Sequence, residues 1–509
     1  MDLNRLTPVE QANKRRRWTR FLVIAALLAG ALYYLIFENT YVVAYEDDRR
    51  HFMYGSIGSE IANGLPYWVF KALPVLYQEE LGPKGYRRFG FLYESEDADL
   101  PIGVSRRIVQ GIERVWLNCA VCHVGTYRES PSSDPVKLYG APANNLRLYE
   151  FIQFLRRVAA DSKFTADNVV RAIDSEAVGG DLNFLERALY RYVIVDRVRD
   201  GLLDVRNRLG FLDRQFDWGP GRVDTFNPYK AIQFNFPMDR DHITEIELNG
   251  SSDYPSIWRQ APREGMQLHW DGNNTSVAER NLSAALGAGV TPVTVDRDSI
   301  KRLESWIWDL PAPPFPKAAE IDAGAAEKGR KLYADYCADC HGMGAGDGGY
   351  DYDTARYGRL GRVVRLSDIA TDRGRWASYT ENFAAAQNLL YAGYPWRFSQ
   401  FRKTEGYASQ PLDGIWARSP YLHNGSVPTL RDLLEPADNR PALWYRGGDL
   451  FDFAKVGYRS DDGAASKVSL FLYDTSRPGN SNRGHEGAAY GTELDAAGKD
   501  AIVEYMKTL

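Results

Sequence analysis

Apolar side chains recur at helical spacing in several separate stretches of the chain. In the segment 298–310, Ile300, Leu303 and Ile307 stand three or four positions apart, so they share one face of an α-helix. The terminal segment 495–509 shows the same periodicity. Further helices are predicted at 106–117, 146–160, 183–209 and 325–333. The pattern therefore predicts a mainly α-helical protein.

A charge-free apolar run lies near the N-terminus, at residues 21–37. The basic side chains that precede it are Lys14, Arg15, Arg16, Arg17 and Arg20. Because basic segments stay on the cytoplasmic side of a membrane, the pattern predicts a cytoplasmic segment 1–20 and one transmembrane anchor at 21–37. The rest of the chain is then expected outside the cytoplasm. A cleaved signal peptide is the alternative, although the residues after the run form a poor cleavage site.

A proline-rich segment divides the remaining chain. Residues 311–316 read Pro-Ala-Pro-Pro-Phe-Pro, which ends a helix and forms a stiff connection. We therefore predict an N-terminal domain at 38–310, a linker at 311–317 and a C-terminal domain at 318–509.

Composition narrows the class of protein. Of the 509 residues, 44% are hydrophobic and 25% are charged, which is typical of a globular chain and excludes a disordered one. The net charge of -5 argues against a nucleic-acid partner, since such proteins carry a basic excess.

The four cysteines all lie in two motifs, Cys119-Ala-Val-Cys122-His123 and Cys337-Ala-Asp-Cys340-His341. The pattern C-x-x-C-H is typical of covalent c-type haem attachment, because two cysteines on one turn form thioethers with the haem and the following His binds the iron. A zinc ribbon requires the two pairs to lie close together, and here more than two hundred residues separate them. The sequence thus predicts two covalently bound haem c groups, with His123 and His341 as proximal ligands.

Each motif lies between two predicted helices, a frame that resembles the cytochrome c fold. For the second motif these helices are 325–333 and 495–509, and for the first they are 106–117 and 298–310. The stretch 124–297 is too long for a simple loop. We therefore expect two cytochrome c-like haem domains, the first with a large insertion.

The ligand on the other face of each iron decides between electron transfer and reaction with small molecules. For the second haem the sequence leaves His423 and His485, since Met343 is too close to His341 and Met506 has the spacing of a packing residue. For the first haem the nearby candidates are Met238, His242, Met266 and His269.

The segment 416–430, which reads WARSPYLHNGSVPTL, resembles a signature of bacterial dihaem cytochrome c peroxidases. The Met ligand that follows the signature in that family is missing, because residues 434–438 read LEPAD. The stretches 118–125, 269–274 and 484–486 are more similar to the rubber oxygenase branch of the superfamily.

In that branch the C-terminal haem has two His ligands, so the resemblance implies His485 as the second ligand. It also implies an open N-terminal haem, lined by aromatic residues, that reacts with O2 or peroxide. Together with the predicted anchor, this describes a periplasmic oxidoreductase held at the bacterial inner membrane, with an electron donor or acceptor and a small-molecule oxidant as partners. A non-catalytic electron-transfer cytochrome with both irons six-coordinate is the alternative.

The segment 269–281 is the expected wall of the reactive pocket. Peroxide cleavage requires a base and a cation, which Glu279 and Arg280 supply, and Trp270 lines the pocket or relays an electron. The alternative is an ordinary helix start, capped by Thr275 or Ser276 with Glu279 in the first turn.

A weaker pattern suggests calcium. The acidic residues of a glycine-rich loop, Asp347, Asp351 and Asp353, are candidate Ca2+ ligands, although their spacing is not that of an EF-hand.

Overall fold

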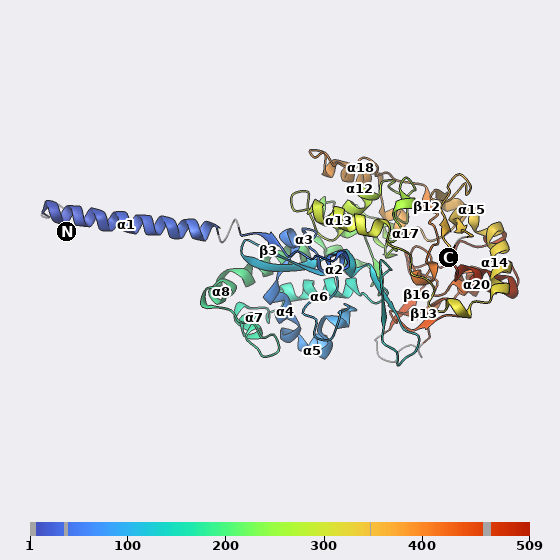
Figure 1. The fold of residues 1–509 in the computed structure, drawn as a ribbon, viewed down its shortest axis with the longest axis horizontal. Coiled ribbons are helices and arrows are strands. Elements are labelled where there is room, and N and C mark those ends of the chain that lie inside the picture. Colours follow the sequence, from blue (N-terminus) through green and yellow to red (C-terminus); the bar gives the residue numbers. More distant parts are fainter. Residues whose placement is uncertain (1–6, 35–38, 347, 462–469) are drawn as a thin grey trace.

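A computed structural model describes residues 7–34, 39–346, 348–461 and 470–509. One long helix, α1 (Pro8–Tyr33), extends away from a body that holds the rest of the described chain (Figure 1). The chain is 44% helical and 12% strand, so the prediction of a mainly α fold is wrong. The reason is that many connections between helices pair locally into short antiparallel ribbons.

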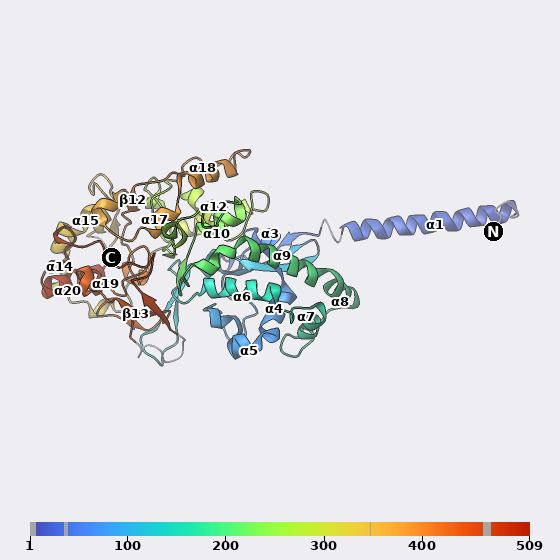
Figure 2. The same ribbon diagram turned by 180° about the vertical axis from the view of Figure 1, so that it is seen from behind.

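The helices of the body, drawn from two sides in Figures 1 and 2, are α2 (Asp48–Tyr54), α3 (Ser59–Asn63), α4 (Tyr67–Leu76), α5 (Gln78–Leu81), α6 (Leu148–Ala160), α7 (Ala166–Ile173), α8 (Phe184–Leu189), α9 (Val195–Arg208), α10 (Asn227–Gln233), α11 (Glu245–Leu248), α12 (Val277–Gly287), α13 (Arg297–Trp308), α14 (Ala323–Tyr336), α15 (Ala338–His341), α16 (Leu366–Ile369), α17 (Gly374–Ser378), α18 (Glu381–Leu390), α19 (Leu430–Leu433) and α20 (Ala496–Met506). A π-helical turn, Tyr190–Ile194, joins α8 to α9. The helices predicted at 146–160, 183–209, 298–310, 325–333 and 495–509 are therefore confirmed.

The first four strands form the largest sheet, in the order β1-β3-β4-β2. The strands are β1 (Tyr41–Val42), β2 (Leu65–Pro66), β3 (Val104–Val109), β4 (Ile112–Leu117), β5 (Val124–Tyr127), β6 (Val136–Tyr139), β7 (Arg222–Val223), β8 (Ser252–Asp253), β9 (Met343–Gly344), β10 (Tyr350–Asp351), β11 (Val363–Arg365), β12 (Gly406–Ala408), β13 (Leu443–Arg446), β14 (Phe451–Asp452), β15 (Gly457–Tyr458) and β16 (Phe471–Asp474). Beyond the four-stranded sheet, the described strands pair two by two.

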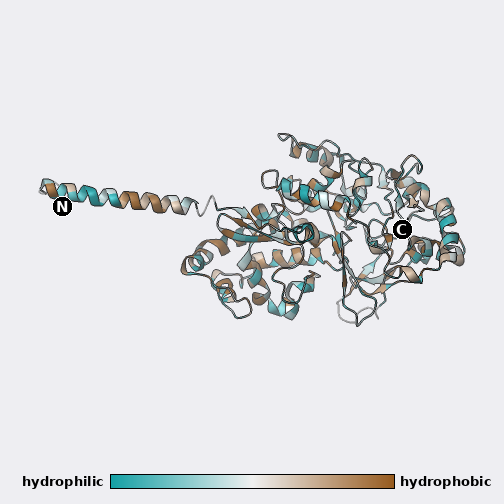
Figure 3. Ribbon diagram, viewed as in Figure 1, coloured by the Kyte–Doolittle hydropathy of each residue, from teal (hydrophilic) through white to brown (hydrophobic). Residues whose placement is uncertain are grey.

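The helix α1 does not meet the requirements of a membrane span. Thr7 and Glu10 form a capping box at its start, and the helix then runs through the basic residues before it becomes apolar (Figure 3). Its described apolar part, Phe21–Tyr33, rises only about 20 Å at ~1.5 Å per residue, whereas a hydrocarbon core is ~30 Å thick. Within the described residues, no helix combines the length and the apolar character needed to cross a bilayer.

The predicted single-pass anchor at 21–37, and with it the inner-membrane location, is therefore wrong. Residues 35–37 of that segment lie outside the described residues.

The predicted helix 106–117 is also wrong, because this segment forms the β3–β4 hairpin. Val109 pairs with Ile112, so the turn consists of Gln110 and Gly111 alone. Both have positive φ, 53° and 74°, which is the backbone of a type I′ turn. The twist of that turn suits two antiparallel strands, and the hairpin replaces the expected helix.

The helix that enters the first motif region is instead α2. It packs against α13, the predicted closing helix, with the rings of Phe52 and Trp306 4.9 Å apart. The buried His51 contributes a hydrogen bond between Nε2 and Ser299 Oγ at 2.9 Å. The frame of two packed helices is thus present, with a β-hairpin inserted between α2 and the first motif.

The second motif lies in a tighter frame made by α14 and α20. A Cβ atom on Gly329 of α14 would come within 1.8 Å of the carbonyl oxygen of Ala501, so only glycine lets the two helices approach so closely. The rings of Tyr333 and Tyr505 pack across the same contact at 5.0 Å. The helix pair therefore holds the start of the second motif firmly.

The two halves of the chain share a buried polar core. Arg222 of β7, 1% exposed, donates from Nη1 to Asn480 Oδ1 at 2.8 Å. Arg446 of β13 donates from Nη2 to Asp253 Oδ1 at 3.1 Å. The linker is packed as well, since Trp416 Nε1 donates to the Pro313 carbonyl at 2.7 Å. The boundary at 311–317 stays a prediction, but the parts that it separates interlock.

Candidate haem sites

The first motif follows directly after β4 as a tight helical turn, Cys119–Val121. Asn118 fixes this turn from both sides: its Oδ1 accepts from Ala120 N at 3.0 Å, and its Nδ2 donates to the Gly55 carbonyl at 3.0 Å. His123 then hydrogen-bonds through Nδ1 to the Pro255 carbonyl at 3.0 Å. Contacts within the protein therefore fix the conformation of the motif.

The second motif continues from the end of α14 into the short helix α15. Gly342, at φ 72°, ends that helix directly after His341. His341 hydrogen-bonds through Nδ1 to the Gln410 carbonyl at 2.7 Å. The two motif histidines are thus supported in the same way, each by one backbone carbonyl.

This support fits a haem iron. A carbonyl accepts only, so Nδ1 carries the proton and Nε2 is left with the lone pair that a metal binds. Burial lowers the pKa of His123 to about 4, although the bond to Pro255 acts against it. Burial lowers the pKa of His341 too. Both imidazoles are therefore neutral at physiological pH, the form required of an iron ligand.

His485 faces His341. The two ring centroids are 6.2 Å apart and the rings are inclined by 44°. An iron bonded to both nitrogens at about 2 Å, with each centroid about 1.1 Å behind its nitrogen, requires a separation of about 6 Å. Burial, together with nearby His341 and Arg440, lowers the pKa of His485 to about 3. The pair has the spacing of a site with two axial histidines.

The backbone around His485 is specialised for this placement. His485 itself has φ 50° and the preceding Gly484 has φ 83°. A Cβ atom on Gly484 would lie 2.4 Å from the Ile369 carbonyl oxygen and the Thr371 nitrogen. Tyr490 packs on the imidazole, with centroids 4.8 Å apart. The glycine thus lets the chain pass close to α16 and present His485.

His423, the other histidine considered for the second haem, lies elsewhere. Its ring stacks on Tyr407 with centroids 4.1 Å apart, and its buried Nε2 has no hydrogen-bond partner among the described residues. Burial and the charges of Arg375 and Arg222 lower its pKa to about 3. Of the two candidates, His485 faces His341 and His423 packs on Tyr407 instead, and the second ligand itself stays a prediction.

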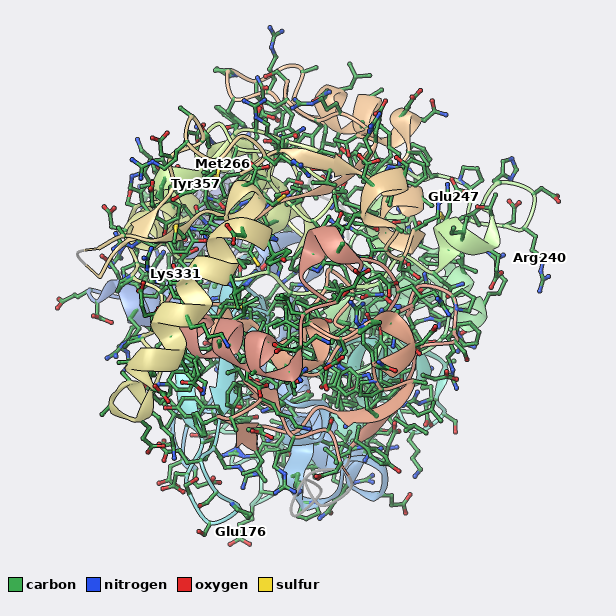
Figure 4. The ribbon with its side chains drawn as sticks, turned by 90° about the vertical axis from the view of Figure 1, so that its right-hand side faces the viewer. Glu176, Arg240, Glu247, Met266, Lys331 and Tyr357 are labelled. Atoms are coloured by element: carbon green, nitrogen blue, oxygen red, sulfur yellow. The ribbon has the colours of Figure 1, made fainter. Side chains whose placement is uncertain are left out.

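No comparable pair occurs at the first motif. Of the four candidates, Met238 packs near Trp218 in a separate cluster, and His242 is exposed and bonds Asp239 through Nδ1 at 2.7 Å. Met266 is buried against Gly361, beside Tyr357 in Figure 4. Among the described histidines, none has its ring within a ligand pair's distance of His123.

His269 is the remaining candidate, and it has other partners. Its Nδ1 bonds Asn273 Oδ1 at 2.6 Å, and its ring stacks on Phe401 with centroids 6.5 Å apart. Burial lowers its pKa to about 4. His269 therefore lies in the pocket wall as a neutral imidazole, as part of an aromatic group.

Arg280, on the second turn of α12, lies within electrostatic reach of both His123 and His269, since its charge lowers the pKa of each. Burial and the nearby Arg263 lower the pKa of Arg280 itself to about 10. Its guanidinium donates to Asn281 Oδ1 at 3.2 Å. Arg280 therefore stays charged at neutral pH.

Glu279, the residue before it, is fully engaged. Its carboxylate accepts from Ser399 N and Oγ at 2.9 and 3.0 Å. It also accepts from Gln400 N and Asn274 Nδ2, both at 3.0 Å. Ser276 caps α12 as the alternative interpretation expects, accepting from Glu279 N. These bonds connect the start of α12 to the segment that follows α18.

Trp270 lies between the supports of the two motif histidines. Its Nε1 donates to the Asp253 carbonyl at 2.8 Å, two residues from the Pro255 carbonyl that holds His123. On the other side, Gln410 Nε2 donates to the carbonyls of Gln267 and His269 at 3.1 and 3.4 Å. The carbonyl of that same Gln410 holds His341.

Aromatic side chains dominate the core around the first motif. This cluster includes Ala120, packs on Cys119 and extends to distant parts of the chain. Its buried aromatic members are Phe52, Tyr54, Phe226, Tyr229, Tyr379, Phe383, Tyr391, Phe398 and Phe401. The expectation of an aromatic surrounding thus has a structural counterpart.

The described calcium candidates, Asp351 and Asp353, have partners within the protein. Asp347 lies outside the described residues. Asp351 pairs with Arg356, and Asp353 accepts from the backbone nitrogen of Ala355 at 2.9 Å. In the part of the chain that the structure describes, no three His, Cys, Asp or Glu side chains are grouped to hold a metal ion.

Comparison with known proteins supports the haem interpretation. A family model described as RoxA-like, cytochrome c-like matches residues 406–445. That segment contains His423 and also Gln410, whose carbonyl holds His341. The family match itself supports a c-type haem cytochrome of the RoxA-like branch. Covalently bound haem c follows from such a domain.

Two relatives come from Sinorhizobium fredii, and both are uncharacterised. Protein y4iJ is 24% identical over 97% of this chain and 100% of its own length. Protein y4iM is 31% identical over 50% of this chain and 64% of its own length.

The residues that support the motif histidines have no signature in the sequence. Pro255 and Gln410 act through their backbone carbonyls, which every residue possesses, so residue type gives no signal for them. Asp253 and its partner Arg446 are charged residues in an ordinary sequence context. For His485 the sequence does offer a signal, the preceding Gly484. A glycine can adopt the positive φ that brings this histidine close to another segment.

Proposed function

We propose that the chain is a dihaem c-type oxidoreductase whose two haem sites have different tasks. The site of Cys119, Cys122 and His123 reacts with O2 or peroxide, and the site of Cys337, Cys340 and His341 transfers electrons. One observation supports this division above the others: His485 faces His341 at 6.2 Å, whereas no described histidine is paired with His123.

A haem iron with one protein ligand binds and reduces small oxidants, and one with two ligands exchanges electrons. The residues at the first site support the reactive task. Arg280 places a positive charge in the pocket where negative charge develops as an oxygen–oxygen bond breaks. The aromatic cluster that includes Ala120 would keep water away from that charge and provide a medium of low polarity.

The catalytic residues proposed for the first site are Arg280 and Trp270, while Glu279 acts by holding the pocket wall. Trp270 is suited to an electron relay because hydrogen bonds connect its surroundings to Pro255 on one side and Gln410 on the other. Electrons then pass between the sites through Trp270. The expected partners are an electron donor or acceptor and a small-molecule oxidant.

The test is ligand binding to the oxidised holoprotein. Imidazole and cyanide should bind one haem of the two, and the electron paramagnetic resonance spectrum should show about half of the haem as high-spin. Two low-spin haems that ignore both ligands would instead establish the alternative function, a non-catalytic electron-transfer cytochrome.

A further inference from the structure

One acidic side chain fastens a distant segment of the chain to the wall of the first haem site. Glu279 lies in the first turn of α12, and its four hydrogen bonds reach Asn274, Ser399 and Gln400. The last two residues belong to the segment 391–402, which follows α18. In both views of the fold α18 lies beside α12 (Figures 1 and 2). The contact therefore joins parts of the chain about 120 residues apart.

Two further bonds lie next to this carboxylate. Thr275 Oγ1 donates to Gln400 Oε1 at 3.1 Å, and Arg402 N donates to the Asn273 carbonyl at 2.9 Å. Both come from the stretch just before α12, so the segment is attached to this wall at three neighbouring points. Hydrogen bonds to a carboxylate are the strong ones among them.

The segment has one apolar side and one polar side. Phe398 and Phe401 are buried, at 2% and 4% exposure, whereas Ser399, Gln400 and Arg402 are exposed. The two phenylalanines belong to the aromatic cluster that includes Ala120 and packs on Cys119. Phe401 also stacks on His269, and the next residue, Trp270, donates to the Asp253 carbonyl, two residues from the carbonyl that holds His123. The apolar side thus packs into the core that includes part of the first motif, and the polar side faces solvent.

We propose that Glu279 is a positioning residue that pins the segment 391–402 as an outer wall of the first haem site. It thereby sets how readily small molecules reach that haem. The access part rests on the proposed function, because only a haem with an open face binds such molecules. The Glu279 bonds lie near solvent, so water can replace them when the segment moves away from α12. The loss of this one side chain should therefore change the fraction of molecules in which the segment is detached.

The experiment compares Glu279→Ala and Glu279→Gln with the unmodified holoprotein. Two readouts are used: trypsin cleavage after Arg397 and Arg402, and the rate at which imidazole binds the oxidised first haem. Loss of charge-assisted bonds raises the population of the lifted segment, so Glu279→Ala should increase both rates about tenfold. Glu279→Gln should lie between, because an amide presents only one acceptor oxygen.

Two controls test whether the effect of the Glu279 substitutions is confined to the segment 391–402. Glu381→Gln changes an exposed acid at the start of α18 that makes none of these bonds, and it should leave both rates unchanged. Cleavage after the exposed Arg365, on β11, serves as a reference within each sample. Equal acceleration after Arg365 would indicate general loosening and would contradict a local pin.

The remaining outcomes are also decisive. Unchanged cleavage in Glu279→Ala would overturn the pin, and faster cleavage with an unchanged imidazole rate would overturn the role of the segment as a wall. If Glu279→Ala does not fold, Ser399→Pro removes both donors of that residue, N and Oγ, and leaves α12 intact, and both rates should again increase. If no haem of the unmodified protein binds imidazole, the proposed function fails, while cleavage still reports on the pin.

Discussion

The two C-x-x-C-H regions share a motif and differ in what surrounds it. In both, a backbone carbonyl holds Nδ1 of the motif histidine, Pro255 for His123 and Gln410 for His341. The second region adds a facing histidine, His485, whereas the first adds the half-buried cation Arg280 and aromatic rings. The comparison teaches that the motif determines only the cysteines and the first histidine of each site. Distant parts of the chain determine which residues lie opposite that histidine.

The difference has a structural origin in how each region is framed. The second motif follows α14 without interruption, and α20 packs tightly against that helix at Gly329. The first motif follows a β-hairpin, and the long stretch between it and α13 contributes the residues 253–281 that surround it. The larger insertion leaves room for a pocket wall made of side chains from several segments.

Removal of either cysteine pair should give the largest effect. Cys119→Ala with Cys122→Ala, and Cys337→Ala with Cys340→Ala, should each lose half of the covalent haem, because each pair supplies its own thioethers. Haem staining of denatured protein and intact mass measure the loss. A variant that retains both haems, or loses both, would contradict two separate sites.

Substitution of His485 should make the second haem site resemble the first, with one histidine and no facing imidazole. His485→Ala leaves His341 without its facing imidazole, so the second haem should become high-spin and imidazole should then bind both haems. The optical spectrum and the binding stoichiometry report the change. His242→Ala, at an exposed histidine, is the control, and a low-spin spectrum that persists in His485→Ala would place the ligand elsewhere.

Substitution of Arg280 should affect the first region alone. Removal of a preorganised positive group that stabilises developing charge costs about 10²–10³ in rate, so Arg280→Ala should slow the reaction with peroxide by that factor. Arg280→Lys should recover part of it. Stopped-flow kinetics measure the rate, and Arg240→Ala, at an exposed arginine outside both regions, should leave it unchanged.

A smaller effect distinguishes His423 from a ligand. Its folded pKa is about 3 against an ordinary 6.5, so the unfolded chain binds the extra proton and stability falls as pH drops from about 6.5 towards 3. The slope for one such proton is about 1.4 kcal/mol per pH unit. His423→Asn should remove that part of the slope in denaturant unfolding and leave both haem spectra unchanged at pH 7.

The sequence predicts the parts of the fold that depend on local periodicity. The helices α6, α13, α14 and α20 all follow from it, because their apolar faces repeat along a single segment. The β3–β4 hairpin does not, since its signal is a two-residue turn at Gln110-Gly111. The membrane span predicted over α1 is wrong because the apolar part of that helix has the hydrophobicity of a span without its length.

The candidate sites divide in the same way. The motif cysteines and histidines can be found from spacing, and His485 from family resemblance. The carbonyls of Pro255 and Gln410 could not be predicted, because contacts between distant segments leave no mark on residue type. Glu279 shows the same limit, since its partners in the segment 391–402 become visible only in three dimensions.

The buried bond between Arg222 and Asn480 has a consequence for how the protein is made. Arg222 lies in the same ribbon, β7–β8, as Asp253, next to the carbonyls that serve the first site, while Asn480 belongs to the last thirty residues of the chain. A polypeptide still emerging from the ribosome exposes that arginine without its partner. The polar core beside the first site therefore depends on a contact between residues 258 positions apart in the sequence, so it is complete only once both segments have folded together.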